Sequence, residues 1–189
     1  MTTVFKQESN IGTVQIKVNK DNLLKALTIV LGAISSRATL PILNNILIQT
    51  NGPDQILITA TDLELTIKTK CEASVALQGS VTIPAKKFYE VIRELPPGEI
   101  EVTVAKNNAV NIKTNRSFFK IMGLEADDFP KPPTPSTEQP LELDEKILKR
   151  CFNLTSFAVS RDETRHALNG ALMILKPKTA RKKYHGRPK

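Results

Sequence analysis

The chain has 189 residues, of which 40% are hydrophobic and 24% are charged, and its formal net charge is +8. These proportions are ordinary for a globular protein, and the longest nearly apolar run, residues 26–34, is too short to span a bilayer. The first ten residues lack the apolar stretch of a signal peptide, so we expect a cytoplasmic protein without a membrane partner.

The excess positive charge is concentrated near the C-terminal end of the sequence. Residues 176–189 contain seven lysines and arginines and no acid, whereas residues 1–175 contain 20 basic and 19 acidic residues. Global charge alone therefore does not indicate a nucleic-acid-binding domain. Cys71 and Cys151 are far apart and lack a CxxC motif, which favours reduced thiols over a zinc site.

The first predicted elements are a strand and an amphipathic helix. Residues 14–18, VQIKV, alternate apolar and polar side chains as a half-buried strand does. Asn19 provides a helix N-cap, and the helix after it has one apolar face with Lys25 pointing away from it. The residues of that face are Leu23, Leu24, Leu27, Val30, Leu31 and Ile34.

More strands and a second helix follow, which together predict an α+β fold. Strands are predicted over residues 43–50, 55–62, 63–73 and 80–84. The second helix covers residues 85–95, with Phe88, Val91, Ile92 and Leu95 on its buried face. Residues 99–124 are predicted to form further strands joined by a turn at Asn107 and Asn108.

A proline-rich linker separates this first unit from a second copy of its beginning. Five prolines between residues 130 and 140 are incompatible with regular structure. Residues 16–48 and 141–173 align at a constant offset of 125, which matches the caps Asn19 and Asp144 and the apolar residues Leu23 and Leu148. Such a register indicates a duplicated supersecondary unit.

No motif of an enzyme is present. The glycines are scattered singly, no GxSxG motif occurs, and Asp62 with Glu64 is either a metal-binding pair or the solvent face of a strand. Several cations lie on helix faces turned away from the core, and they are either solvated or a sparse lining that touches phosphates. They are Lys25, Lys86, Arg93, Lys146, Lys149 and Arg150, to which the loop residue Arg37 adds a further cation.

Five segments resemble the bacterial DNA sliding clamp, the β subunit of DNA polymerase III. In chain order they are TLPILNNILI, ITATDLEL, IPAKKFYEVIREL, FKIMGLEADDFP and TRHALNGALMIL. The resemblance implies the α+β DNA clamp fold, in which each domain has two helices backed by antiparallel sheets. In this family three such domains per chain form a head-to-tail homodimeric ring around duplex DNA.

On this resemblance the chain has four parts. A complete clamp N-terminal domain covers residues 1–127, and the proline-rich linker covers 128–140. The first strand–helix–strand part of a second, central clamp domain covers 141–175, and a basic tail unlike the family covers 176–189. The abrupt loss of the family pattern after Leu175 leads us to expect a frameshift or a truncated gene.

The resemblance also implies DNA-contacting positions. Arg37 matches a loop arginine that contacts DNA, Lys86 matches a second basic contact, and Lys25 belongs to the same lining. In the second copy, Asp162, His166 and Ala167 occupy family contact positions, where an amide and an aromatic pair can stand. Because an acid repels phosphate, Asp162 is carried over only as a position.

Protein-contacting positions follow from the same resemblance. Lys87, Arg116 and Phe119 match the face that meets the third domain of the partner chain. Arg165 and Leu168 match the pocket that takes peptides of polymerase and clamp-loader subunits, but the strand that completes this pocket in the family is absent.

We therefore predict a non-catalytic DNA polymerase processivity factor that needs no cofactor. Its expected partners are duplex DNA, DNA polymerase III, clamp-loader subunits and a second clamp chain, and residues 1–189 alone are expected not to confer processivity. The alternative is a nucleic-acid-binding fragment that acts through the basic residues 176–189.

Overall fold

The computed structural model describes residues 12–34, 40–131, 142–160, 162 and 164–174. The chain divides into two units, Met1–Thr134 and Pro135–Lys189. Within the described residues, no helix is long and apolar enough to cross a membrane.

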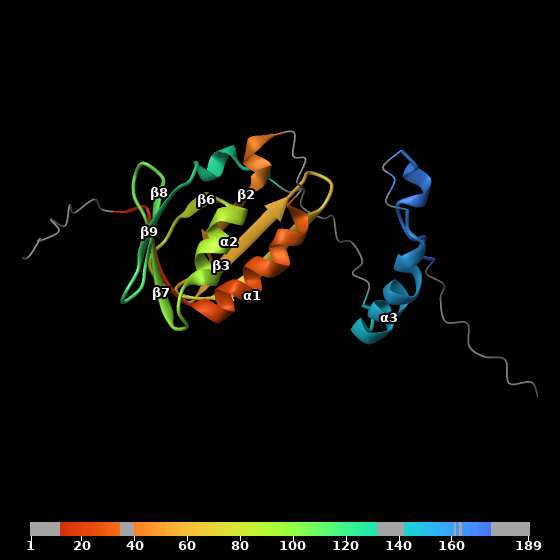
Figure 1. The fold of residues 1–189 in the computed structure, drawn as a ribbon, viewed down its shortest axis with the longest axis horizontal. Helices are drawn as coiled ribbons and strands as arrows, with labels where there is room; N and C mark the ends of the chain where they lie inside the picture. Colours follow the sequence, from red (N-terminus) through yellow and green to blue (C-terminus); the bar gives the residue numbers. More distant parts are fainter. Residues whose placement is uncertain (1–11, 35–39, 132–141, 161, 163, 175–189) are drawn as a thin grey trace, which may run out of the picture. The chain divides into compact units, whose positions relative to one another are not determined.

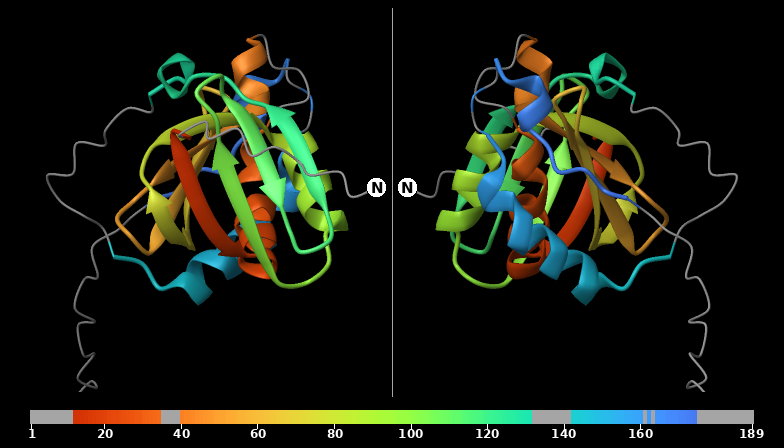
Figure 2. Two further views of the ribbon diagram at one scale, coloured as in Figure 1. Left: turned by 90° about the vertical axis from the view of Figure 1, so that its left-hand side faces the viewer. Right: turned by 90° about the vertical axis from the view of Figure 1, so that its right-hand side faces the viewer.

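The described strands of the first unit form two antiparallel sheets (Figures 1 and 2). A five-stranded sheet has the order β5-β1-β7-β8-β9, and a four-stranded sheet has the order β4-β3-β2-β6. The left view of Figure 2 faces the five-stranded sheet, with β1 in red and α1 behind it. The strands are β1 (Val14–Asn19), β2 (Asn45–Thr50), β3 (Gln55–Thr61), β4 (Thr66–Glu72), β5 (Ser74–Leu77), β6 (Ser80–Pro84), β7 (Glu99–Val104), β8 (Ala109–Lys113) and β9 (Phe118–Met122).

The first unit is built from two halves with the same order of elements. In one half, β1 lies in the five-stranded sheet, α1 (Lys20–Val30) follows, and β2, β3 and β4 lie in the other sheet. In the other half, β6 lies in the four-stranded sheet, α2 (Ala85–Glu94) follows, and β7, β8 and β9 lie in the five-stranded sheet. The halves are joined where β1 pairs with β7 and β2 pairs with β6, both antiparallel.

Helix α1 begins at the predicted cap and ends earlier than the apolar pattern suggests. Asn19 Oδ1 accepts hydrogen bonds from the backbone N–H groups of Asp21 (2.9 Å) and Asn22 (3.4 Å), which satisfies two free helix donors. The α-helix stops at Val30 and tightens into the 3-10 turn η1 (Leu31–Ala33). The predicted apolar face therefore spans an α-helix and a 3-10 turn rather than one helix.

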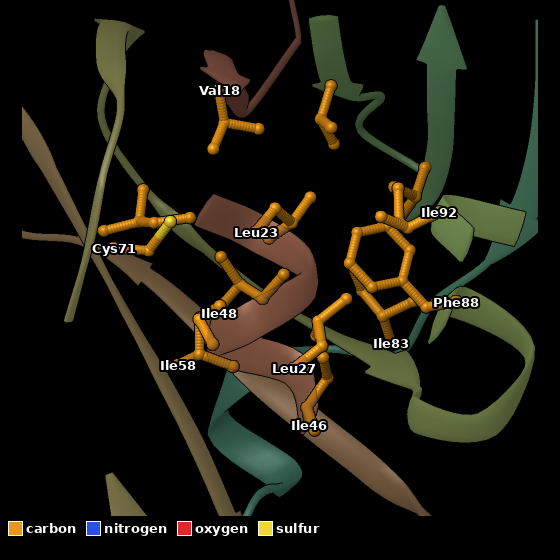
Figure 3. Close-up of a cluster of buried hydrophobic side chains, with 14 of the residues drawn as sticks. Val18, Leu23, Leu27, Ile46, Ile48, Ile58, Cys71, Ile83, Phe88 and Ile92 are labelled. Atoms are coloured by element: carbon orange, nitrogen blue, oxygen red, sulfur yellow. The ribbon is translucent and has the colours of Figure 1, made fainter. Parts of the chain in front are cut away.

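The core lies between the two helices and the sheets. Leu23 and Leu27, the fourth and eighth residues of α1, are each 1% exposed, and Phe88 and Ile92, the fourth and eighth residues of α2, are fully buried. Figure 3 shows these four side chains together with isoleucines of β2, β3 and β6. The predicted helix faces are confirmed at these positions, whereas Leu24 and Val91 are only partly buried.

The β3–β4 segment differs from the prediction. Asp62 and Glu64 lie in a turn and not on a strand: Asp62 Oδ1 accepts hydrogen bonds from the backbone N–H groups of Glu64 (3.1 Å) and Leu65 (2.7 Å). Leu63 takes a positive φ of 81° to close this turn. Both alternatives for Asp62 and Glu64, a metal-binding pair and the solvent face of a strand, are thus wrong in placing them on a strand, because an Asp side chain that binds the backbone N–H groups after it favours a turn.

Two further corrections concern strand bounds. The segment 43–50 opens with the 3-10 turn η2 (Pro41–Asn44) before β2 begins at Asn45. The chain changes sheets at Ala73, and β5, which was not among the predicted strands, pairs with β1 in the five-stranded sheet.

The first unit stays packed beyond β9. Leu124 and Thr82 exchange two backbone hydrogen bonds of 3.0 and 3.1 Å, so the segment after β9 is tied to β6 of the other sheet. The 3-10 turn η3 (Ala126–Asp128) follows, and Phe129 is 3% exposed. Packed residues thus continue to Phe129, two positions past residue 127, the end of the domain that we expected.

The described part of the second unit repeats the helical elements of the first. Helix α3 (Glu145–Thr155) and the 3-10 turn η4 (Ser156–Ala158) coincide with α1 and η1 at the offset of 125 residues. Asp144 caps α3 by accepting a hydrogen bond from the Ile147 N–H (3.0 Å), as Asn19 caps α1. A further 3-10 turn, η5 (His166–Leu168), lies where the offset of 125 residues places the counterpart of η2.

The strands predicted for the second unit are not formed within its described residues. Residues 142–144 and 171–174 have no ladder partner, whereas their counterparts β1 and β2 each pair with strands on both sides. A strand needs neighbours for its backbone N–H and C=O groups, so the strand–helix–strand prediction is correct here only for the helix.

We predict that Leu27→Ala lowers the free energy of unfolding of the first unit by about 2–5 kcal/mol, because it leaves a cavity in the core. Ile29→Ala, on the exposed side of the same helix, is expected to change it by less than about 0.5 kcal/mol. Urea denaturation followed by circular dichroism measures both, and equal effects would contradict the burial of Leu27.

The two thiols are predicted to react very differently. Burial, assisted by the negative charge of Glu72, raises the pKa of Cys71 from 9.0 to about 11, whereas Cys151 is exposed. Since the thiolate is the reactive form, a thiol reagent near pH 8 is expected to label Cys151 quickly and Cys71 only after unfolding. Peptide mapping of the labelled chain tests this, and fast labelling of Cys71 in the folded protein would contradict it.

Candidate nucleic-acid interface

Two helices of the first unit lie side by side and carry exposed cations on the surface away from the core (Figure 1). Lys25 of α1 and Lys86 and Arg93 of α2 are exposed, and we call these three residues the basic helix face. The buried fourth and eighth residues of each helix fix its rotation, so these cations are directed outward. None of the ion pairs among the described residues involves Lys25 or Lys86.

Lys20 connects the two helices. Its Nζ donates hydrogen bonds to the carbonyl oxygens of Arg93 (2.9 Å) and Leu95 at the C-terminal end of α2. A cation at a helix C-terminus is favoured because free carbonyl oxygens and the helix dipole make that end negative. The first residue of α1 is thereby held against the end of α2.

The surroundings of the basic helix face distinguish its members. Lys25 lines a shallow hollow of about 310 Å³ between α1 and β4, together with Lys70 and Glu72. Arg93 is paired with Glu94 (Nε to Oε1, 3.1 Å) and lies 5.9 Å from the ring centre of Tyr89. The sequence analysis missed Lys70, since nothing in a strand pattern indicates that β4 lies beside α1.

Arg37, the loop arginine predicted to contact DNA, lies outside the described residues, as do residues 176–189 of the basic tail. Their predicted roles stay predictions.

Strand β9 forms the last strand of the five-stranded sheet and exposes apolar side chains. Phe118 is 64% exposed, Phe119 39% and Met122 56%. Phe118 and Met122 project from the sheet face opposite to that of the buried Ile121, because side chains alternate along a strand. The prediction named only Phe119. The alternation along FFKIM places Phe118 and Met122 together, which is the signal that could have identified them.

Arg116 and Lys87, the other two residues predicted for this protein-contacting face, lie on different elements. Arg116 belongs to the turn between β8 and β9, where its N–H donates to Thr114 Oγ1 (3.4 Å), and it lines a hollow beside Pro96 and Gly98. Lys87 is exposed on α2.

The second unit brings Asp162, Arg165 and Leu168 into one loop. Asp162 Oδ1 accepts hydrogen bonds from Thr164 Oγ1 (2.6 Å) and the Thr164 N–H (3.1 Å), and Asp162 Oδ2 lies 3.4 Å from Arg165 Nε. Arg165 O accepts from the Leu168 N–H at 2.8 Å, and Leu168 O accepts from the Ser160 N–H at 2.9 Å. The Asp162 carboxylate thus organises the loop and neutralises its arginine.

The remaining positions of this loop are less informative. Ala167 is exposed between His166 and Leu168, and the backbone of all three forms η5. Leu168 is 54% exposed.

Comparison with known proteins identifies the same family over most of the chain. The model of the family described as DNA polymerase III beta subunit, N-terminal domain, matches residues 14–133. The beta sliding clamp of Chlamydia muridarum is 36% identical over 156 residues, which are 82% of this chain and 41% of the relative. That of Haemophilus influenzae is 34% identical over 158 residues, which are 82% of this chain and 43% of the relative.

Solved structures agree with the sequence relatives. The beta sliding clamp of C. crescentus has a TM-score of 0.78 at 34% identity, over 84% of this chain and 43% of that chain. The DNA polymerase sliding clamp of Bacillus subtilis has a TM-score of 0.76 at 28% identity, over 82% of this chain and 42% of that chain. The chain therefore spans about two fifths of the length of these relatives.

We predict that the loop of the second unit depends on the charge of Asp162. The hydrogen bonds from Thr164 hold the pKa of Asp162 below its usual 3.8. A carboxyl group with a lowered pKa contributes stability above its unfolded pKa and loses it as the pH falls through the folded value. An NMR titration is expected to show this lowered pKa, with Thr164→Val returning it towards 3.8, and an unchanged pKa in that variant would contradict the assignment.

Proposed function

The chain belongs to the DNA polymerase III beta subunit family, and we propose that its first unit is a DNA-facing domain of a non-catalytic sliding clamp. In this role the domain forms part of a ring around duplex DNA and helps to keep a polymerase on its template. The observation that supports this proposal most directly is the pair of neighbouring helices whose outward cations, Lys25 and Lys86, have no ion-pair partner among the described residues.

A sparse basic helix face suits a protein that must move along DNA. Lysines attract phosphates without reading bases, and their contribution falls as salt rises. Few such contacts give weak binding, so topological enclosure rather than affinity would retain the clamp. We assign Lys25, Lys86 and the loop Arg37 to this role, together with the positions of Asp162, His166 and Ala167 in the second unit.

The exposed strand β9 suits contact with a second clamp chain. An edge strand offers unpaired backbone groups for antiparallel pairing with another strand. Phe118, Phe119 and Met122 add apolar surface at the same edge. We assign Phe119, Arg116 and Lys87 to a contact between protomers of a ring.

Arg165 and Leu168 are the candidates for contact with peptides of a polymerase or clamp loader. Both side chains are exposed in one loop, where an apolar peptide residue and a carboxylate would meet a leucine and an arginine. The ion pair of Arg165 with Asp162 is exposed, and such pairs are weak enough to exchange partners. We place this activity in the cytoplasm, where a bacterial replication protein meets its DNA.

The decisive experiment measures the salt dependence of duplex binding for the full chain by fluorescence anisotropy. Lys25→Gln combined with Lys86→Gln is expected to reduce the slope of log K against log salt by about 2, since each phosphate contact contributes about 0.9. The matched control combines Lys106→Gln with Lys113→Gln, which removes the same charge from the exposed surface at β7 and β8.

The basic tail is present in every variant, so only the difference between the two pairs reports on the helices. Equal slopes for both pairs would contradict the proposal and would favour binding through residues 176–189.

A further inference from the structure

Glu90 interrupts the line of cations on the outward surface of α2. Lys86, Glu90 and Arg93 follow one another at spacings of four and three residues, so they share one stripe of the helix, and all three are exposed. The buried Phe88 and Ile92 lie on the opposite side of the helix, in the core that Figure 3 shows. An acid therefore stands between the two cations that α2 contributes to the basic helix face.

Helix stability does not account for an acid at this position. Glu90 is the sixth of the ten residues of α2, whereas the helix dipole favours an acid only in the first turn. Lys86 precedes Glu90 by four residues, and this order of lysine and glutamate stabilises a helix less than the reverse order does. Within the part of the chain that the structure describes, no ion pair involves Glu90, and Arg93 pairs with Glu94 instead.

The other acids of the two helices have a structural explanation. Asp21 lies in the first turn of α1, where the helix dipole favours it, and Glu94 is paired with Arg93. Among the acids of α1 and α2, Glu90 is thus the one that neither the helix dipole nor an ion pair between described residues explains. Its charge acts on whatever approaches the outward surface.

A carboxylate on this stripe opposes the approach of a phosphate. At a separation of about 8 Å in water, the repulsion between two unit charges is close to RT, which corresponds to a factor of about 2–3 in a binding constant. Dissolved salt screens this repulsion, with a Debye length of about 8 Å at physiological ionic strength. Neutralising one such acid is therefore expected to strengthen binding at low salt and to matter less at high salt.

We propose that Glu90 limits the affinity of the basic helix face for duplex DNA. This inference rests on the proposed function and names a residue that keeps the contact with phosphates weak. Lys86 attracts a phosphate, and Glu90, one helical turn away, repels it. The stripe thus holds a duplex less tightly than its cations alone would, as suits a protein that moves along DNA.

Fluorescence anisotropy of the full chain with a duplex tests the proposal. Glu90→Gln removes the charge with little change of size, and it is expected to lower the Kd about 2–3-fold at low salt and by less as salt rises. Glu90→Lys changes the charge by two units, so its factor is expected to be about the square of the first, or about 4–9-fold.

Glu101→Gln is the matched control. Glu101 lies on β7 between the buried Ile100 and Val102, so it projects from the sheet face opposite to the core and the helices. It accepts a hydrogen bond from Gln15 Nε2 (3.0 Å), which an amide oxygen can also accept. Both substitutions raise the net charge by one, so the difference between them separates a local effect from that of total charge.

Two results would overturn the inference. They are equal Kd values for Glu90→Gln and Glu101→Gln, and a Kd that Glu90→Gln leaves unchanged or raises. Thermal unfolding followed by circular dichroism is recorded for each variant, and the midpoint is expected to stay unchanged in Glu90→Gln because the side chain is exposed. A large loss of stability would show that the acid serves the fold, which also contradicts the inference.

The variant with Lys25→Gln and Lys86→Gln, measured in the same assay, separates this failure from that of the proposed function. If the lysine pair changes the salt slope more than its control does and Glu90→Gln behaves like Glu101→Gln, only the role of Glu90 is wrong. If the lysine pair also behaves like its control, the helices do not face the duplex and both proposals are wrong.

Discussion

The first unit depends on covering one apolar face of each of its two α-helices. In the first unit, Leu23, Leu27, Phe88 and Ile92 meet between the helices and the sheets, and this cluster fixes the rotation of both helices. The same rotation directs Lys25 and Lys86 outward, because a helix that buries one face exposes the opposite face to solvent. The helical period of the apolar residues therefore determines both the core packing and the position of the candidate DNA surface.

The sequence was informative wherever a local pattern determines the structure. The period of apolar residues located α1 and α2, Asn19 and Asp144 marked two helix starts, and the offset of 125 located α3. The apolar period and the caps are carried by residues within a few positions of one another, as is the Asn107–Asn108 turn, and the offset compares two such local patterns.

Features that depend on distant partners were missed. Nothing within the segment 63–73 says that the chain will change sheets at Ala73 to pair β5 with β1. The turn at Asp62 is a different case, because its hydrogen bonds are local and the turn preference of Asp could have indicated it. Lys70 reaches the candidate surface only because β4 lies beside α1. In the second unit, residues 142–144 and 171–174 match β1 and β2, yet no strand lies beside them among the described residues and they form no ladder there.

The contact of Lys20 with the carbonyl oxygens of Arg93 and Leu95 has a mechanical consequence. The ammonium group of Lys20 joins the first residue of α1 to the last turn of α2, so neither helix end can move without displacing the other. The exposed side chains of Lys25 on α1 and Lys86 on α2 therefore stand on two helices that are tied together at one end.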